Sequence, residues 1–201
     1  MTSRALLLFL SLLLSGCSLF SGFGLFGSAS PEAPAAQTHG RLSSSTVSPE
    51  ARQILEEART LWTDSGECID AEEATRLLDK AVQLDPLDPA PLILRSRSLS
   101  DQGYLEEAFA DITRAIQLSP TAESYATRGL LCLKMNRPAG ARRDFEYAEK
   151  LNPNEPLLHI YRASAAFLEK RPKDACAGLE KGCALGVCGP WEKAKATGLC
   201  S

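Results

Sequence analysis

The chain has 201 residues, of which 44% are hydrophobic and 23% are charged, so we expect one ordinary folded unit. Its formal net charge is -3, and acidic and basic residues are interleaved along the chain instead of forming a patch. A row of phosphates would meet no matching basic surface, so the sequence argues against nucleic acid as a partner.

The first 16 residues have the features of an export signal. Arg4 supplies a positive charge, and an apolar run from Ala5 to Leu14 follows it, interrupted only by Ser11. This run is far shorter than the roughly 20 residues that span a bilayer, which disfavours a retained transmembrane helix. We therefore expect residues 1–16 to be removed as a signal peptide.

The residues around the expected cleavage point carry a second pattern. Leu14, Ser15 and Gly16 precede Cys17, and this L-S-G-C order resembles the lipobox of bacterial lipoproteins. The resemblance implies that Cys17 becomes the first mature residue and carries acyl chains such as palmitate, two or more of which anchor a protein firmly to a membrane. In enterobacterial lipoproteins an aspartate after the cysteine favours inner-membrane retention. Ser18 stands there, so the resemblance implies an outer-membrane protein that faces the periplasm; the inner membrane and a secreted protein without lipid are the alternatives.

Residues 17–48 are rich in Gly, Ser, Ala and Pro, a composition typical of a flexible linker. We interpret this segment as the lipidated N-terminus followed by a tether.

A repeat dominates the rest of the chain. Residues 81–86 read A-V-Q-L-D-P, residues 115–120 read A-I-Q-L-S-P, and residues 148–153 read A-E-K-L-N-P. The spacings are 34 and 33 residues, and a period of this length that ends in proline resembles the tetratricopeptide repeat. The resemblance implies an all-α solenoid whose repeats occupy residues 49–187, with helix pairs over about 50–86, 89–120, 122–153 and 156–186.

Small and large apolar residues recur at fixed places within each unit. Such residues fall on one face of a helix when they are spaced by three or four. The frame predicts small residues where two helices cross closely, namely Ala74, Ala108, Ala141 and Ala175, and larger ones that fill the space between neighbours, namely Leu78, Ile112, Phe145 and Leu179. The first unit departs from the frame, because extra residues over 63–68 lengthen its turn.

The two ends of a repeat stack need capping. Residues 189–195 read G-P-W-E-K-A-K, which predicts a short last helix with proline in its first turn, and we assign residues 188–201 to a disulfide-linked cap. Trp191 is then expected to pack on the last repeat.

Four of the seven cysteines lie in the last 26 residues, as Cys176, Cys183, Cys188 and Cys200, which indicates an oxidising compartment. Three connectivities are possible among them. If the cap folds back antiparallel, we expect the nested pairs, with Cys183 bound to Cys188 and Cys176 bound to Cys200. A four-thiolate zinc site is the alternative, although no C-x2-C pair is present.

The sequence nominates no reaction. Metalloprotease, phosphate-loop and nucleophile-elbow motifs are absent, and so is a C-x-x-C-H haem motif. His159, on an expected first helix beside Tyr161, is given a structural role. We expect no enzyme activity, no cofactor and no metal.

Binding is the expected use of this fold, whose first helices line a surface that holds a peptide or a partner helix. The groove is predicted to include Ile93, Arg97, Ala126, Leu130, Leu133, Ile160 and Ser164. Tetratricopeptide proteins that grip a C-terminal carboxylate use a set of lysines and asparagines that is not found here, which disfavours a chaperone-tail receptor. Arg97 is the groove residue suited to orient an acidic group.

The sequence therefore predicts a membrane-anchored scaffold for protein partners in an envelope assembly. A second hypothesis is an exported cysteine-rich enzyme or β-lactam-binding protein similar to Sel1-type repeats, although those proteins carry one cysteine pair per repeat. A third is a purely structural spacer, in which changes at Arg97 and Leu130 would leave all partner binding intact.

Overall fold

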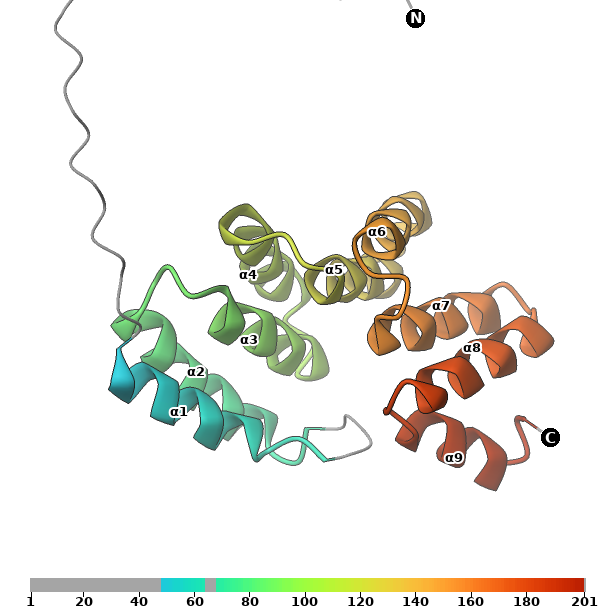
Figure 1. The fold of residues 1–201 in the computed structure, drawn as a ribbon, viewed down its shortest axis with the longest axis horizontal. Helices are drawn as coiled ribbons and strands as arrows, with labels where there is room; N and C mark the ends of the chain where they lie inside the picture. The colour runs from blue at the N-terminus through green and yellow to red at the C-terminus, as the bar shows by residue number, and fades with distance from the viewer. Residues whose placement is uncertain (1–47, 64–67, 201) are drawn as a thin grey trace, which may run out of the picture. The chain divides into compact units, whose positions relative to one another are not determined.

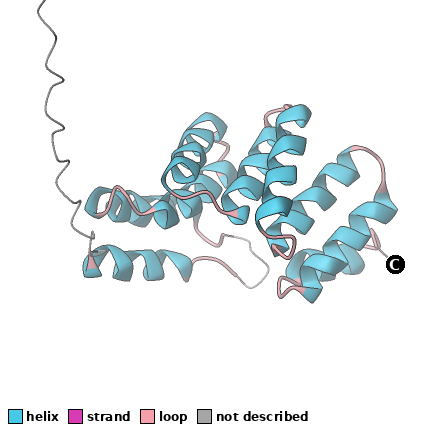
Figure 2. Cartoon of the chain, turned by 45° about the horizontal axis from the view of Figure 1, so that its top comes forward, coloured by secondary structure: helices cyan, strands magenta, loops and turns pink. Residues whose placement is uncertain are grey.

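The computed structural model describes residues 48–63 and 68–200, which belong to one compact unit that spans residues 44–201. The expected signal peptide, Cys17 and the linker lie outside the described residues. Within the described part, every regular element is an α-helix and the elements follow one another as antiparallel pairs (Figures 1 and 2). The helices are α1 (Pro49–Arg59), α2 (Ala71–Leu84), α3 (Pro89–Asp101), α4 (Leu105–Leu118), α5 (Ala122–Lys134), α6 (Pro138–Leu151), α7 (Pro156–Leu168), α8 (Pro172–Ala184) and α9 (Gly189–Ala196).

The predicted fold is confirmed: α1 to α8 form four helix pairs, and α9 packs against α8 at the end of the stack. Figure 1 shows the pairs following one another along the unit. The first helices begin where short polar side chains cap them, as when Asp88 accepts a hydrogen bond from the Ala90 N–H at 2.9 Å. Proline occupies the first turn of α1, α3 and α7, where its missing N–H costs nothing.

The turn inside each of the last three units uses one residue with a left-handed backbone. Gly103 has a φ of 88° after α3, and Asn136 has a φ of 57° after α5. The next residue then bonds back to the helix, as the Arg137 N–H does to the Cys132 carbonyl at 2.7 Å. This arrangement satisfies the last carbonyls of the first helix and reverses the chain into the second.

The core confirms the predicted alternation of small and large residues. Ala74, Ala108, Ala141 and Ala175 are at most 1% exposed, and the larger residues Leu78, Ile112, Phe145 and Leu179 are at most 6% exposed. Removing this apolar surface from water, at about 25 cal/mol per Å², is the main source of stability in such a stack.

In the third unit, α5 lies very close to α6 at Gly129. A Cβ atom built at Gly129 would lie 2.4 Å from Cε1 of the Phe145 ring, which is 4% exposed. The ring therefore occupies the space that a side chain would need at Gly129. In the other units the same position holds Ala58, Ser96 or Ala163, opposite an aliphatic residue instead of a phenyl ring.

An arginine on the first helix binds an aspartate on the second helix in two of the units. The Arg95 guanidinium donates to both oxygens of Asp111 at 2.6 and 2.7 Å, and Arg128 donates to Asp144 at 2.9 and 2.7 Å. Each aspartate side chain is nearly buried, with 12% exposed for Asp111 and 8% for Asp144. These bidentate pairs fix the two helices of a unit against each other.

The fourth unit lacks this clamp because Gly178 stands where the aspartate would be. Arg162, the counterpart of Arg128, donates instead to Glu149 of α6 at 2.8 Å. A Cβ at Gly178 would meet the His159 carbonyl oxygen at 3.0 Å, so the missing side chain allows α8 to lie close to α7.

The C-terminal cysteines form two disulfides. Cys176 of α8 is bonded to Cys200 after α9, with their Cα atoms 5.6 Å apart, and Cys183 is bonded to Cys188 with a Cα separation of 3.8 Å. These are the nested pairs expected from the sequence. Trp191 packs against the same core as α8, so the last helix covers the end of the fourth unit.

Candidate functional site

The first helices form a continuous face, because α3 contacts α5 and α5 contacts α7. Two cavities adjoin on this face. The Trp62 cavity has a volume of about 290 Å³ and is lined by Arg59, Trp62, Ala90, Ile93, Leu94, Arg97 and Glu123. The Tyr161 cavity has a volume of about 140 Å³ and is lined by Arg97, Ser100, Asp101, Thr127, Leu130, Leu131 and Tyr161.

Arg97 is the residue that the two cavities share. Its guanidinium carbon lies 5.6 Å from the centre of the Trp62 ring, a distance at which a cation and an aromatic face attract each other. The side chain is half-buried, and no carboxylate within the described residues forms an ion pair with it. By contrast, Arg95 of α3 and Arg128 of α5 each form an ion pair with an aspartate.

Trp62 reaches the site from the lengthened turn of the first unit. Its backbone N–H donates to the Arg59 carbonyl at 3.1 Å, and the residue pairs with Cys68 in an isolated antiparallel bridge. The indole ring of Trp62, which follows α1, thus lies against Arg97 of α3.

Two buried polar atoms in these cavities lack a partner. The indole Nε1 of Trp62 and the hydroxyl oxygen of Thr127 are buried without a hydrogen bond to any described residue, and Thr127 is only 2% exposed. Leaving a buried polar group unsatisfied costs about 1–3 kcal/mol. Each of the two atoms exposes less than 1 Å², so both belong to the packed walls of the site.

The Tyr161 phenol adds a hydroxyl to the same face. It is 9% exposed, and burial raises its pKa above 10.0, because the charged form would lose its hydration. The charges of Glu123 and Asp101 raise this pKa further, whereas Arg97 lowers it. The phenol therefore remains protonated at neutral pH and is available as a donor.

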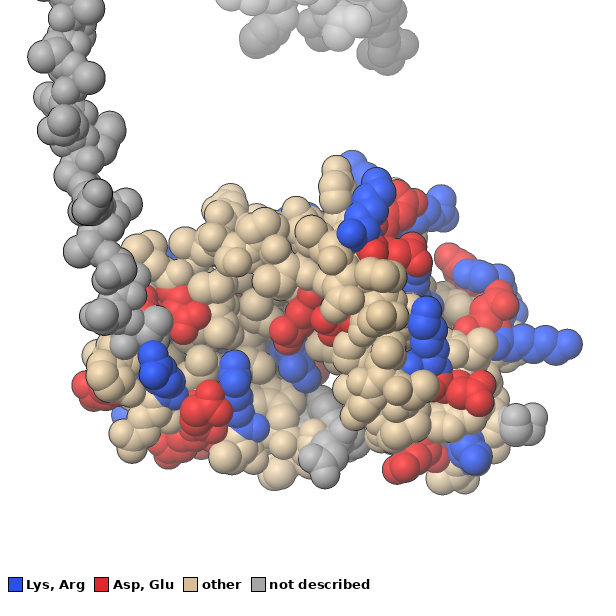
Figure 3. Space-filling model, in the orientation of Figure 1, with Lys and Arg blue, Asp and Glu red and all other residues tan. Residues whose placement is uncertain are grey.

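Carboxylates stand at the edges of the site. Glu123 lines the Trp62 cavity and Asp101 lines the Tyr161 cavity, where Asp101 lies 3.6 Å from Nζ of Lys134. Figure 3 shows that positive and negative side chains are interspersed on the face that it presents. The central cation at Arg97 is thus flanked by negative charge at both ends.

The structure corrects the predicted groove. Arg97 and Leu130 line cavities, and Ile93 contributes a 7% exposed edge to the Trp62 cavity. Ala126 is fully buried, and Ile160 is 7% exposed. Ile160 packs so closely on Gly182 that a Cβ atom at Gly182 would collide with it. Both residues therefore belong to the core.

The other two predicted groove residues also lie away from these cavities. Ser164 lines neither cavity, and its hydroxyl donates to the Ile160 carbonyl at 3.3 Å. Leu133 faces a different crevice, between α6, α7 and α8. Trp62, Thr127 and Tyr161, which the sequence analysis did not assign to the groove, complete the site instead.

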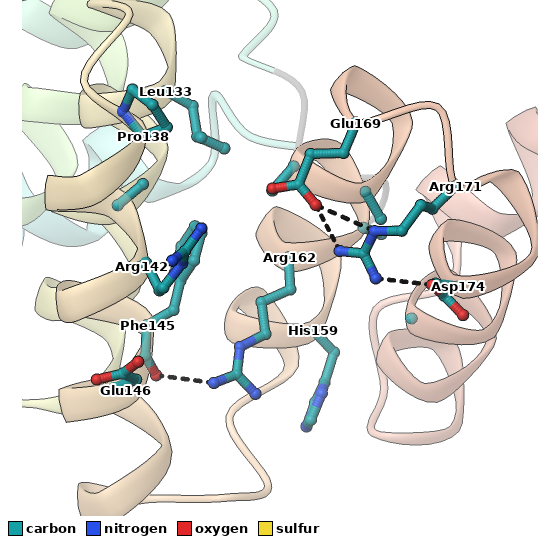
Figure 4. Close-up of a pocket in the computed structure, with 15 residues that line it drawn as sticks. Leu133, Pro138, Arg142, Phe145, Glu146, His159, Arg162, Glu169, Arg171 and Asp174 are labelled. Atoms are coloured by element: carbon teal, nitrogen blue, oxygen red, sulfur yellow. Dashed lines mark hydrogen bonds and ion pairs between the residues drawn. The ribbon is translucent and has the colours of Figure 1, made fainter.

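The crevice between α6, α7 and α8 has a volume of about 370 Å³ (Figure 4). Four of its charged side chains form ion pairs: Arg171 binds Glu169 and Asp174, and Arg162 binds Glu149 of α6 as well as the carbonyl oxygen of Phe145. Arg142, which also lines the crevice, is exposed and keeps its hydration, whereas Arg97 is half-buried. The crevice therefore makes a weaker demand for a charged ligand than Arg97 does.

His159 lies at this crevice in a structural position. Its Nε2 is 2.9 Å from the Pro153 carbonyl oxygen, and burial lowers the pKa of the imidazole. The neutral ring therefore ties the start of α7 to the preceding loop.

The remaining cysteines, Cys68 and Cys132, are free, and Cys132 is buried in the core. Burial raises the pKa of both thiols, so neither is activated as a nucleophile. Within residues 48–63 and 68–200, no group of three or more His, Cys, Asp or Glu side chains is placed to hold a metal ion. In the same part of the chain, none of the helices combines the length and apolarity needed to traverse a bilayer.

No protein-family model matches the chain. Among curated human proteins, it is 35% identical to tetratricopeptide repeat protein 13 over 105 residues, which are 52% of this chain and 12% of that protein. It is 29% identical to tetratricopeptide repeat protein 34 over 182 residues, which are 80% of this chain and 31% of that protein. The chain thus spans less than a third of either relative.

Solved structures share the fold at lower identity. A thermophilic tetratricopeptide protein of Thermus thermophilus, TTC0263, superposes with a TM-score of 0.59 at 20% identity, covering 74% of this chain and 84% of that one. The complex of Cut9 and Hcn1 from the APC/C matches with a TM-score of 0.56 at 18% identity, covering 75% of this chain and 31% of that one. These likenesses show the fold of the helical unit.

Proposed function

Because the chain is a tetratricopeptide-repeat protein, we propose that it is a non-catalytic adaptor that holds a protein partner in the bacterial cell envelope. One observation carries the proposal: the first helices present two adjoining cavities that share a half-buried arginine without an ion pair to any described carboxylate. Such a surface offers apolar contact and a single charge, the combination that recognises a protein segment.

A membrane anchor forms the second part of the proposal. The L-S-G-C order at Cys17 supports acylation of that cysteine, and residues 18–47 would link the lipid to the repeats. At up to about 3.3–3.6 Å per residue, a linker of this length reaches on the order of 100 Å. The repeats would then sample a broad zone beside the membrane, which we place at the outer membrane on its periplasmic side.

Capture of a partner tests the adaptor function. The tagged protein is crosslinked in cells and purified, and the parent is compared with Leu130→Glu, which puts a charge on the wall of the Tyr161 cavity. Leu168→Glu is the matched control, because Leu168 is 69% exposed and lines neither cavity. The adaptor proposal predicts a partner that is lost with Leu130→Glu and kept with Leu168→Glu. A partner that both variants retain would refute the assignment to this face.

Metabolic labelling tests the anchor. Cells that express the parent protein should incorporate labelled palmitate into it, and Cys17→Ser should lose both the label and membrane attachment. Density fractionation of the labelled membranes then reports inner or outer membrane. An unlabelled parent protein would remove the anchor from the proposal while leaving the adaptor function to be judged by capture.

A further inference from the structure

The charge balance around Arg97 indicates which partner segment fits. Arginines at neighbouring places on α3 and α5 bind aspartates of their own unit, whereas Arg97 lies against the face of Trp62 and forms no ion pair with a described carboxylate. This half-buried cation has lost part of its hydration without a direct ion pair among the described residues. The complementary group is a carboxylate, which an arginine binds with two parallel hydrogen bonds.

The position of Arg97 distinguishes an internal acidic residue from a chain terminus. The Trp62 cavity extends from Arg97 toward α1, and the Tyr161 cavity extends from it toward α7. A segment that ended at Arg97 would leave one cavity empty. A segment that passes over Arg97 fills both, and it brings one apolar side chain to Ile93 and Leu94 and another to Leu130.

The extent of the site favours an extended segment. The Trp62 cavity and the Tyr161 cavity lie on opposite sides of Arg97. An extended chain rises about 3.3 Å per residue, whereas a helix rises about 1.5 Å, so a short extended segment spans both cavities.

The flanking carboxylates restrict the number of acidic residues. Glu123 in one cavity and Asp101 in the other would repel a second or third negative charge. We propose that this site binds an extended segment of the partner with one internal Asp or Glu at Arg97 and an apolar residue two positions to either side of it, on the same face of the segment. This inference rests on the proposed adaptor function and names the ligand class of the same site.

Binding of blocked peptides to the whole protein tests the inference. The chain has two tryptophans, so Trp191→Phe leaves Trp62 as the reporter of its own cavity by fluorescence. The probe is acetyl-Leu-Ser-Glu-Ser-Leu-amide, because alternate side chains of an extended chain lie on one face. Its partner peptide carries Gln in place of Glu. A charged hydrogen-bonded pair is worth about 1.5–3 kcal/mol, so the Gln peptide should bind about tenfold or more weakly.

Variants and further peptides complete the design. Arg97→Gln should abolish the preference for Glu, whereas Arg142→Gln, which removes an exposed arginine at the α6–α8 crevice, should leave it unchanged. A peptide with three consecutive glutamates should bind more weakly than the single-Glu probe. Acetyl-Ser-Leu-Leu with a free carboxylate represents a chain terminus and should not compete.

Four outcomes would overturn the inference: equal binding of the Glu and Gln peptides, a preference that survives Arg97→Gln, stronger binding of the free-terminus peptide, or no binding by any probe. The first comparison sets two peptides against the same protein, so a folding defect caused by a change at Arg97 cannot obscure it. If the peptides fail while Leu130→Glu still removes a captured partner, the adaptor function stands and only the acidic-segment inference falls.

Discussion

Replacing Gly129 tests how the third unit packs. A Cβ at this position would lie 2.4 and 2.7 Å from two carbons of the Phe145 ring, whereas carbon atoms in contact are normally about 3.5–4.0 Å apart. The ring is buried, so it can yield only by displacing its own neighbours. Overpacking of this kind costs about 1–3 kcal/mol, whereas alanine in place of glycine inside a helix gains about 1 kcal/mol. We expect Gly129→Ala to lower the free energy of unfolding by up to about 2 kcal/mol.

A double-mutant cycle isolates the contact. Phe145→Leu alone should also destabilise the protein, by about 1–3 kcal/mol, because it removes buried ring atoms. The pair Gly129→Ala with Phe145→Leu relieves the collision, so the two losses should fall short of additivity by at least about 1 kcal/mol. The pair resembles the combinations in other units, where a small side chain faces an aliphatic one.

Urea unfolding followed by far-ultraviolet circular dichroism measures all four proteins of the cycle. The reasoning predicts that Phe145→Leu converts Gly129→Ala from a destabilising to a neutral or stabilising change. If the two losses add fully, or if Gly129→Ala alone stabilises the parent protein, then the contact between Gly129 and Phe145 does not restrict the size of the side chain at position 129.

The other predictions concern the clamp, the disulfides and a buried imidazole. Asp144→Ala should lower the free energy of unfolding by about 2–3 kcal/mol, since it leaves a half-buried arginine unpaired. Glu169→Ala removes one partner of an exposed ion pair and should cause no measurable change. Equal effects of the two variants would contradict the role of burial. Cys200→Ser opens a disulfide that joins residues 24 apart, and it should lower the free energy of unfolding by about 3–4 kcal/mol. Cys188→Ser opens a disulfide that joins residues 5 apart and should cost less. Thermal unfolding without reductant should rank the two variants in this order. Burial lowers the pKa of His159 below 6.5, so the unfolded chain takes up a proton at a higher pH than the folded protein does. The free energy of unfolding should therefore fall as the pH drops below about 6.5, and His159→Gln should lose this part of the pH dependence. A titration by NMR that puts the pKa of His159 above 6.5 would refute this prediction.

The sequence predicted the fold because the period carries most of the information. The expected pair over 89–120 contains α3 (Pro89–Asp101) and α4 (Leu105–Leu118), and the proline that ends each unit marks the boundary. Small residues such as Ala108 identify helix crossings, because bulk there is incompatible with close packing. Local signals and the global repeat agree, so the assignment needed no tertiary information.

The clamp was missed although its signal is in the sequence. Arg95 and Arg128 occupy the same place in consecutive units, and each is followed by an aspartate 16 residues later, as Asp111 and Asp144. A search for charged residues that recur with the repeat would have found both pairs. Apolar periodicity alone treats them as solvent-exposed side chains.

The binding face was predicted only in part, for a geometric reason. The repeat frame places Ala126 and Leu130 on one side of α5, but it does not give the depth of each residue once α3 and α7 pack beside it. Trp62 escaped prediction because the lengthened turn interrupts the repeat. Its contact with Arg97 joins two positions that the period does not relate to each other.

Photocrosslinking in living cells tests the central claim, that the face of the first helices binds a partner. A photoreactive amino acid replaces Leu130 in the Tyr161 cavity and, in a control protein, Arg142 at the α6–α8 crevice. We expect a discrete crosslinked partner from position 130 and none from position 142, with the partner's crosslinked peptide containing one acidic residue between apolar ones. A discrete partner from position 142 alone would show that the first helices do not form the binding face.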